Sequence, residues 1–358
     1  MRLQTRTLAL AVFTAFAIAP SPTYAQAGAG KWEVEAHGGG MFTSTPSSGS
    51  AETLPVGASF SPGLGLSTRR ESTWLFGDGS TLLNQVAAAF RSSSRITALD
   101  SVLGSAAASR ENGGSFGFRL ARRFGSRYAA EFGFDVTQTP LRFTSAATSG
   151  IEATRGSFVT VFNSVLTGPF NNLNVTATAD VNEGSGHQIL TTGVMTVDLI
   201  THGRLIPFVT GGGGVISNGG DSPSVTVVGN YAFSIVGVVP INETDRVTVR
   251  VVERDHSAVG VFGGGVRYAA SPRWGLRFDV RATAGGGKVD TIVDAAPSAV
   301  NGTPPGAIFS LTAPSIQFST VPTIPSSLGA PTISSLRTFT GSGSAVRTNV
   351  TGGVYFRF

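Results

Sequence analysis

The sequence predicts an all-β chain that folds into an eight-stranded antiparallel transmembrane β-barrel. Three observations support this fold class. Eight segments alternate apolar and polar residues with a period of two, which is typical of strands with one apolar face and one polar face. Very short turns join three pairs of these segments, whereas long stretches join the others. After residue 25, no segment has the run of about 20 apolar residues that a membrane-spanning helix needs.

The N-terminus has the three parts of an export signal in their usual order. Two arginines precede an apolar run over residues 8–19, and small residues follow up to Ala25. The alternative, a buried N-terminal helix, does not account for this order. We therefore expect residues 1–25 to be a signal peptide that is cleaved after Ala25, and residues 26–358 to form the barrel with its loops.

The strands can be placed in chain order by their alternation. Within residues 128–137, for example, Phe132 and Val136 lie on one side while Glu131 and Asp135 lie on the other. The eight predicted strands are residues 32–37, 116–121, 128–137, 188–201, 205–215, 258–270, 274–284 and 346–358.

Short turns and long loops alternate strictly between these strands. The short turns contain Gly or Pro and are residues 125–127, 202–204 and 271–273. The long loops are about residues 43–113, 141–187, 218–257 and 287–345. Outer-membrane barrels have short periplasmic turns and long extracellular loops, so we expect this chain to lie in the cell outer membrane. The first and last strands must pair, because an open sheet edge is not tolerated in lipid.

The long loops contain regular patterns of their own. Apolar residues recur at helical spacing within residues 81–103 and 151–166, which predicts two loop helices. Residues 231–239 and 246–253 alternate around a polar segment, residues 240–245. We interpret them as a hairpin that continues above the membrane. The alternative is two more membrane strands, which would make ten.

The two faces of the predicted strands differ in a way that favours a membrane barrel over a soluble exported β-sandwich. One face is rich in aromatic residues and the other carries charges, whereas the outward face of a sandwich should be polar. The residues expected to face lipid are Trp32, Phe116, Phe118, Phe132, Phe134, Trp274, Leu276, Phe278, Val280, Val354, Phe356 and Phe358.

Acidic residues and arginines nearly balance on the inward face. The predicted lumen network consists of Glu33, Glu35, Arg119, Arg123, Glu131, Asp135, Asp198, Arg267, Arg277, Asp279, Arg281, Arg347 and Arg357. An eight-stranded barrel is only wide enough for its side chains to fill the interior, and buried charges must be paired. We therefore expect a structural ion-pair network that closes the lumen. The alternative is a gated ion path in which an arginine exchanges carboxylate partners.

Two segments near the C-terminus resemble a known family. Residues 263–281, with their Ser-Pro-Arg turn, resemble the penultimate hairpin of the bacterial outer-membrane β-barrel domain family, the OmpA-like or OmpW-like small barrels. Residues 354–358 resemble the C-terminal signature of that family. The resemblance implies that the barrel assembly machinery reads the last strand through Val354, Phe356 and Phe358. It also implies that outer-membrane lipid and lipopolysaccharide surround the barrel.

Other chemistry has little support in the sequence. There is no Cys, and the basic residues are dispersed despite a net charge of +5, so we expect neither a thiolate site nor nucleic-acid binding. The four His lack metal-ligand spacing, and we expect no metal or cofactor. Asp255, His256 and Ser257 are the nearest approach to a catalytic group, but consecutive residues of a strand point to opposite faces.

These observations predict a non-enzymatic outer-membrane barrel with a structural or surface-interaction role. A small-solute channel, as the OmpW-like resemblance implies, is the alternative. An outer-membrane lipid-modifying enzyme is a third and weaker hypothesis.

Overall fold

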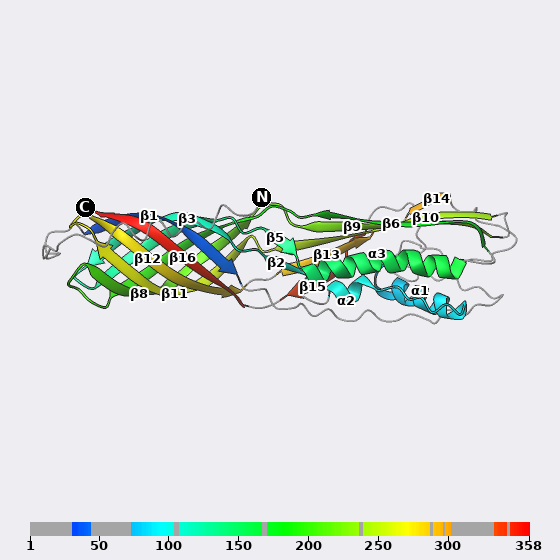
Figure 1. Cartoon of the computed structure of the whole chain (residues 1–358), viewed down its shortest axis with the longest axis horizontal. Coiled ribbons are helices and arrows are strands. Elements are labelled where there is room, and N and C mark those ends of the chain that lie inside the picture. The colour runs from blue at the N-terminus through cyan, green and yellow to red at the C-terminus, as the bar shows by residue number, and fades with distance from the viewer. Residues whose placement is uncertain are drawn as a thin grey trace, which may run out of the picture.

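The structure is a computed structural model. It describes residues 31–43, 73–103, 107–166, 170–235, 239–286, 289–295, 298–301, 333–341 and 344–358. The predicted signal peptide lies outside the described residues. Figure 1 shows two bodies end to end, with a barrel on the left and a layer of helices on a second sheet on the right. We call the second body the distal module.

The barrel is closed by eight antiparallel strands, as the sequence predicts. They follow one another around the ring in the order β1-β16-β12-β11-β8-β7-β4-β3. Their bounds are β1 Trp32–Thr43, β3 Gly113–Phe124, β4 Tyr128–Thr137, β7 His187–Asp198, β8 Leu205–Gly219, β11 His256–Ala269, β12 Trp274–Gly286 and β16 Ser344–Arg357. The first and last of these strands pair from Glu33 with Arg357 to Thr43 with Arg347. The ten-strand alternative is therefore wrong.

The three short turns all lie at one end of the barrel, which we call the short-turn end. Both ends of the barrel sequence meet there: the Trp32 N–H donates to the Phe358 carbonyl over 3.1 Å. Most of the side chains predicted to face lipid are exposed, among them Phe116, Phe132 and Phe278. Phe134 and Leu276 are half-buried. No helix among the described residues is long and apolar enough to cross a membrane.

The distal module is built from the stretches between the barrel strands. Its sheet has the order β15-β13-β10-β9-β6, with β14 paired to β10. The strands are β6 Phe170–Asn182, β9 Ser224–Ile235, β10 Val239–Glu253, β13 Val289–Ala295, β14 Ser298–Asn301 and β15 Ile333–Gly341. The helices are α1 Gly77–Ala89, α2 Leu99–Leu103 and α3 Ser145–Leu166. Between the bodies, β2 Ala108–Arg110 pairs with β5 Leu141–Phe143.

The helices cover one face of this sheet (Figure 1). Ile151, Phe158 and Val165 recur at helical spacing on α3 and are buried. They pack in one apolar core with inward residues of β9, including Val227 and Phe233. The predicted helix over residues 151–166 is present within α3, whereas the helix predicted over residues 81–103 is divided into α1 and α2 by the non-helical residues 90–98. These helices share one apolar core with the sheet.

The predicted hairpin is also present, but its turn is elsewhere. Strand β9 ends at Ile235 and β10 begins at Val239, so residues 240–245 lie inside β10. The prediction that they form the turn is wrong. Glu243 and Asp245 are polar residues that suggested a loop, yet both are buried beneath the helices. Partners from distant segments hold them there, and a local pattern does not reveal such partners.

Candidate functional site

The inward face of the barrel carries the charged residues. Strand alternation turns Glu33 and Glu35 of β1, and every second residue of the other strands, toward the lumen. Of the thirteen residues of the predicted network, twelve are buried, and the Arg123 side chain is 9% exposed. Twelve of them belong to two groups of ion pairs or to a separate pair with His37.

The central group crosses the lumen and consists of Glu35, Arg119, Glu131, Arg277, Asp279 and Arg281. Arg277 Nη1 lies 2.8 Å from Glu131 Oε2, and Arg277 Nη2 lies 2.8 Å from Asp279 Oδ2. Because β12 and β4 lie on opposite sides of the ring, the Arg277–Glu131 bridge spans the barrel.

Each carboxylate of the central group contacts more than one arginine. Glu35 pairs with Arg119 at 2.7 Å and with Arg277 at 3.2 Å. Arg281 Nη2 lies 2.5 Å from Glu131 and 2.8 Å from Asp279. The planar guanidinium suits such sharing because it presents donors in a fork. These contacts occupy the middle of the lumen with paired charges.

A second group lies nearer the short-turn end. Arg357 Nε donates to Glu33 Oε2 over 2.8 Å, and Asp198 accepts from both Arg123 and Arg267. The guanidinium of Arg277 lies over the Phe208 ring at 4.3 Å, and that of Arg267 lies over it at 5.3 Å. This inward aromatic ring therefore separates the two groups while contacting an arginine of each.

His37 joins the charged lumen, although the sequence analysis did not assign it to the network. Its Nε2 lies 2.6 Å from Asp135 Oδ1, and its Nδ1 lies 3.6 Å from Glu35 Oε1. The signal was available, because His37 has the same strand parity as Glu33 and Glu35. The spacing of the four histidines does not indicate this contact, but the strand parity does.

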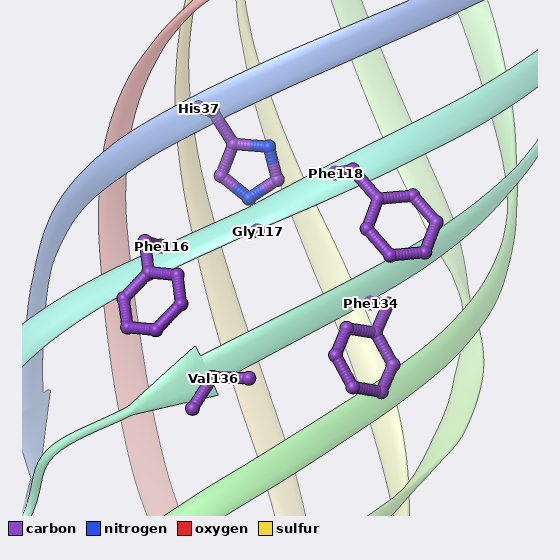
Figure 2. A pocket seen from close by; sticks show the side chains of 6 residues that line it. All are labelled: His37, Phe116, Gly117, Phe118, Phe134 and Val136. Atoms are coloured by element: carbon purple, nitrogen blue, oxygen red, sulfur yellow. The ribbon is translucent and has the colours of Figure 1, made fainter.

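Gly117 lets the imidazole cross a strand. His37, Gly117 and Asp135 form one row across β1, β3 and β4. A Cβ at Gly117 would lie 2.2 Å from the Phe134 carbonyl oxygen and 3.0 Å from His37 Nε2. Figure 2 shows the ring of His37 beside Gly117, between Phe116 and Phe118.

The outer wall is hollowed at the same place. A depression of about 290 Å³ is lined by His37, Phe116, Gly117, Phe118, Phe134 and Val136 (Figure 2). The rings of Phe118 and Phe134 stack with centroids 5.4 Å apart. Almost all of the lining is apolar, so this depression offers few polar contacts to a ligand.

Arg347 does not join these groups. Its pairing with Thr43 places it at the end of the barrel next to the distal module. Among the described residues it makes no salt bridge with the predicted network. One of the ion pairs near that end joins Arg110 and Glu253, at 2.5 Å, and neither residue was predicted as a site residue.

One side of the inner wall is apolar. Leu190, Val194, Ile216, Val259 and Val261 from β7, β8 and β11 form a buried cluster. The charged residues of the central group come instead from β1, β3, β4 and β12. The lumen therefore has walls of different chemistry.

The candidate catalytic residues do not converge. His256 Nδ1 lies 2.9 Å from Ser217 Oγ at an exposed position. Among the described residues, the His256 ring forms no hydrogen bond or ion pair with Asp255 or Ser257. No group of three or more potential metal ligands occurs in the part of the chain that the structure describes.

Comparisons with known proteins identify no family. No family model and no curated protein matches the sequence. Among solved structures, the outer membrane protein OprG from Pseudomonas aeruginosa matches with 9% identity and a TM-score of 0.36. The match covers 92% of this chain and 99% of that chain. The fold assignment therefore rests on the strand order of the chain itself, which closes an eight-stranded antiparallel barrel.

Proposed function

We propose that this chain is an outer-membrane protein with a structural or surface-interaction role. The barrel anchors the chain in the membrane with its short-turn end toward the periplasm, and the distal module stands on the extracellular side. The exposed belt of aromatic side chains on a closed barrel supports the membrane location, because such residues face lipid in outer-membrane barrels. The long extracellular segments carry the functional surface.

The observation that carries this proposal is the central group across the lumen. Arg277 reaches Glu131 on the opposite strand, and Arg119 and Arg281 fill the remaining contacts. Moving one of these side chains aside would leave a buried charge without its partner, which costs several kcal/mol. The lumen is accordingly a packed, charged interior that does not conduct ions.

Planar-bilayer recording of the refolded full chain tests the closed lumen. We expect no steady conductance steps from the wild type in 1 M KCl. The double variant Arg277→Ala and Arg281→Ala removes two large side chains from the lumen and should introduce steps. The matched control is Arg246→Ala and Arg254→Ala, two exposed arginines outside the barrel. Steady steps from the wild type would contradict the proposal.

The candidate surface for the interaction role is the face of the distal sheet opposite the helices, which we call the open face. Its side chains form a polar ladder: Thr226 and Thr248 hydroxyls lie 3.0 Å apart, and Thr244 donates to Asn230 Oδ1 over 2.6 Å. No described helix covers this face (Figure 1). We propose it as the contact surface. In cells whose surface adhesion requires this chain, the double variant Thr226→Lys and Thr248→Lys should abolish that adhesion. The barrel of the variant should still fold, as its heat-induced gel shift would report.

A small-solute channel is the second candidate, and the apolar side of the inner wall favours it. Leu190, Val194 and Val261 could line a path for an apolar solute beside the charges. Liposome-swelling assays with small apolar solutes separate the two functions. Swelling that Val194→Trp abolishes would support the channel, whereas no swelling supports the closed barrel.

The assembly signal remains a prediction. Val354, Phe356 and Phe358 are exposed on the outer face of the barrel, where an assembly factor could reach them before lipid does. We propose that the barrel assembly machinery reads them. Deletion of Phe358 should lower the amount of folded barrel in cells more than it lowers refolding of the purified chain in detergent.

A further inference from the structure

A two-residue pattern repeats at the short-turn end of the barrel. Four strands begin at this end of the barrel. The first residue of each is large, exposed and mainly apolar, and a basic residue immediately precedes it. The four pairs are Lys31-Trp32, Arg127-Tyr128, Arg204-Leu205 and Arg273-Trp274. They introduce β1, β4, β8 and β12, which are every second strand around the closed ring. The four cations are therefore distributed evenly around the rim.

A fifth cation lies on the outer wall beside the first pair. Arg122 is exposed, and its guanidinium lies 5.4 Å from the Trp32 ring centroid and 5.7 Å from that of Phe124. It is held on the aromatic surface by cation–π contacts, while the edge of its fork remains available for hydrogen bonds. We call Lys31, Arg122, Arg127, Arg204 and Arg273 the basic collar.

The acidic side chains of this end do not neutralise the collar. Glu33 and Asp198 point into the lumen, where Arg357 and Arg267 pair with them. Among the described residues, no member of the collar has a salt bridge. Arg204 is half-buried and lies 3.5 Å from the Tyr268 hydroxyl, and the other four members are exposed.

The opposite end of the barrel has a different charge pattern. Arg142 pairs there with both Glu111 and Glu183, and Arg110 pairs with Glu253. Exposed acids and bases are mixed at that end. Among the described residues, the short-turn end combines five cations that have no salt bridge with exposed rings such as Trp32, Tyr128 and Trp274.

We infer that the basic collar binds the phosphate groups of anionic phospholipids in the membrane leaflet at the short-turn end. This inference rests on the membrane insertion proposed above. Aromatic side chains such as Trp32, Tyr128 and Trp274 occupy the headgroup level of a bilayer, which brings the adjacent cations to the depth of the lipid phosphates. Each cation near an anionic membrane surface adds attraction, and five around one rim favour anionic over zwitterionic headgroups.

Tryptophan quenching by brominated lipids tests the inference on the full chain. Trp32 and Trp274 lie at the collar, whereas Trp74 is buried in the distal module and supplies a constant background. The vesicles contain equal amounts of phosphatidylcholine and phosphatidylglycerol, and either one lipid or the other is brominated on its acyl chains. Because both leaflets contain both lipids, the result does not depend on the orientation of the inserted barrel.

For the wild type, we expect brominated phosphatidylglycerol to be enriched about threefold or more around the collar. The enrichment should decrease in 0.5 M salt, because exposed charges are screened. The collar variant combines Lys31→Gln, Arg122→Gln, Arg127→Gln and Arg273→Gln and should lose the enrichment. The matched control removes the same number of positive charges at a distance from the collar. It replaces four exposed arginines by Gln and should keep the enrichment; these are Arg91, Arg95, Arg246 and Arg254.

The outcomes separate this inference from the proposed function. Equal quenching by the two lipids in the wild type, or enrichment that persists in the collar variant, overturns the inference and leaves membrane insertion intact. Quenching by neither lipid contradicts insertion itself. If the collar variant fails to fold, the triple variant Arg122→Lys, Arg127→Lys and Arg273→Lys keeps the charges and should keep the enrichment. In that case the salt dependence of the wild type provides the contradicting result: enrichment that does not decrease in 0.5 M salt overturns the inference.

Discussion

Asp245 makes the stability of the distal module depend on pH, and Asp245→Asn tests this. Asp245 is fully buried on β10, beneath the segment that leads into α1, and its Oδ2 accepts from the Trp74 N–H over 2.7 Å and from the Thr73 hydroxyl over 2.9 Å. Oδ1 has no hydrogen-bond partner among the residues that the structure describes. Burial raises the pKa of this carboxyl to about 7, and nearby Glu243 raises it further against the opposing hydrogen bonds from Trp74 and Thr73.

The magnitude follows from the difference between folded and unfolded pKa values. A pKa of about 7 in the folded state, against about 4 in the unfolded chain, is a shift of about 3 units, which corresponds to about 4 kcal/mol. Between pH 4 and pH 7 the folded module keeps a proton that the unfolded chain has lost. The free energy of unfolding therefore falls as the pH rises through this window and levels off above it.

The asparagine side chain resembles the protonated form of Asp245, because its NH2 group takes the place of the unpaired oxygen. Near pH 4 the variant and the wild type should unfold with similar free energies. At pH 8 the variant should be more stable by up to about 4 kcal/mol. Glu243 and Tyr231 are unchanged in the variant, so the substitution itself alters only the carboxyl group of Asp245.

Urea denaturation of the full chain in detergent, followed by tryptophan fluorescence, measures this difference because Trp74 contacts Asp245 directly. Exposed Asp180 on β6 provides the control, and Asp180→Asn should follow the wild-type pH profile. The reasoning is refuted if Asp245→Asn has the same pH profile as the wild type.

Three further substitutions test the packing of the two bodies. Arg277→Gln leaves the buried carboxylate of Glu131 short of a partner, so the barrel should lose about 3–5 kcal/mol, seen as a lower temperature of the heat-induced gel shift. Gly117→Ala forces a Cβ to within 2.2 Å of a backbone oxygen and should prevent refolding, whereas Gly193→Ala, with nothing within 4 Å, should refold normally in the same gel assay. Phe158→Ala removes a fully buried ring from the module core and should lower its urea midpoint by the equivalent of about 3–5 kcal/mol, with the gel shift of the barrel unchanged.

The sequence by itself determined the barrel to a large extent. Alternation with a period of two is a local property, so it assigned the strands and the face on which Glu35, Arg119 and Glu131 lie. Gly and Pro marked the short turns, and strict alternation of short and long connections indicated the closed antiparallel ring. The same alternation places His37 on the inward face with Glu33 and Glu35, although the sequence analysis did not assign it to the network.

The tertiary structure decided what the local pattern could not. Arg277 and Glu35 are 242 residues apart, and only the register of the closed ring brings them together. The long connections form a helix-covered sheet because their apolar faces are buried only against one another. Glu243 and Asp245 resemble turn residues in isolation, yet burial with Tyr231, Thr73 and Trp74 keeps them inside a strand. A buried polar residue is specified by its partners, and those partners are distant in sequence.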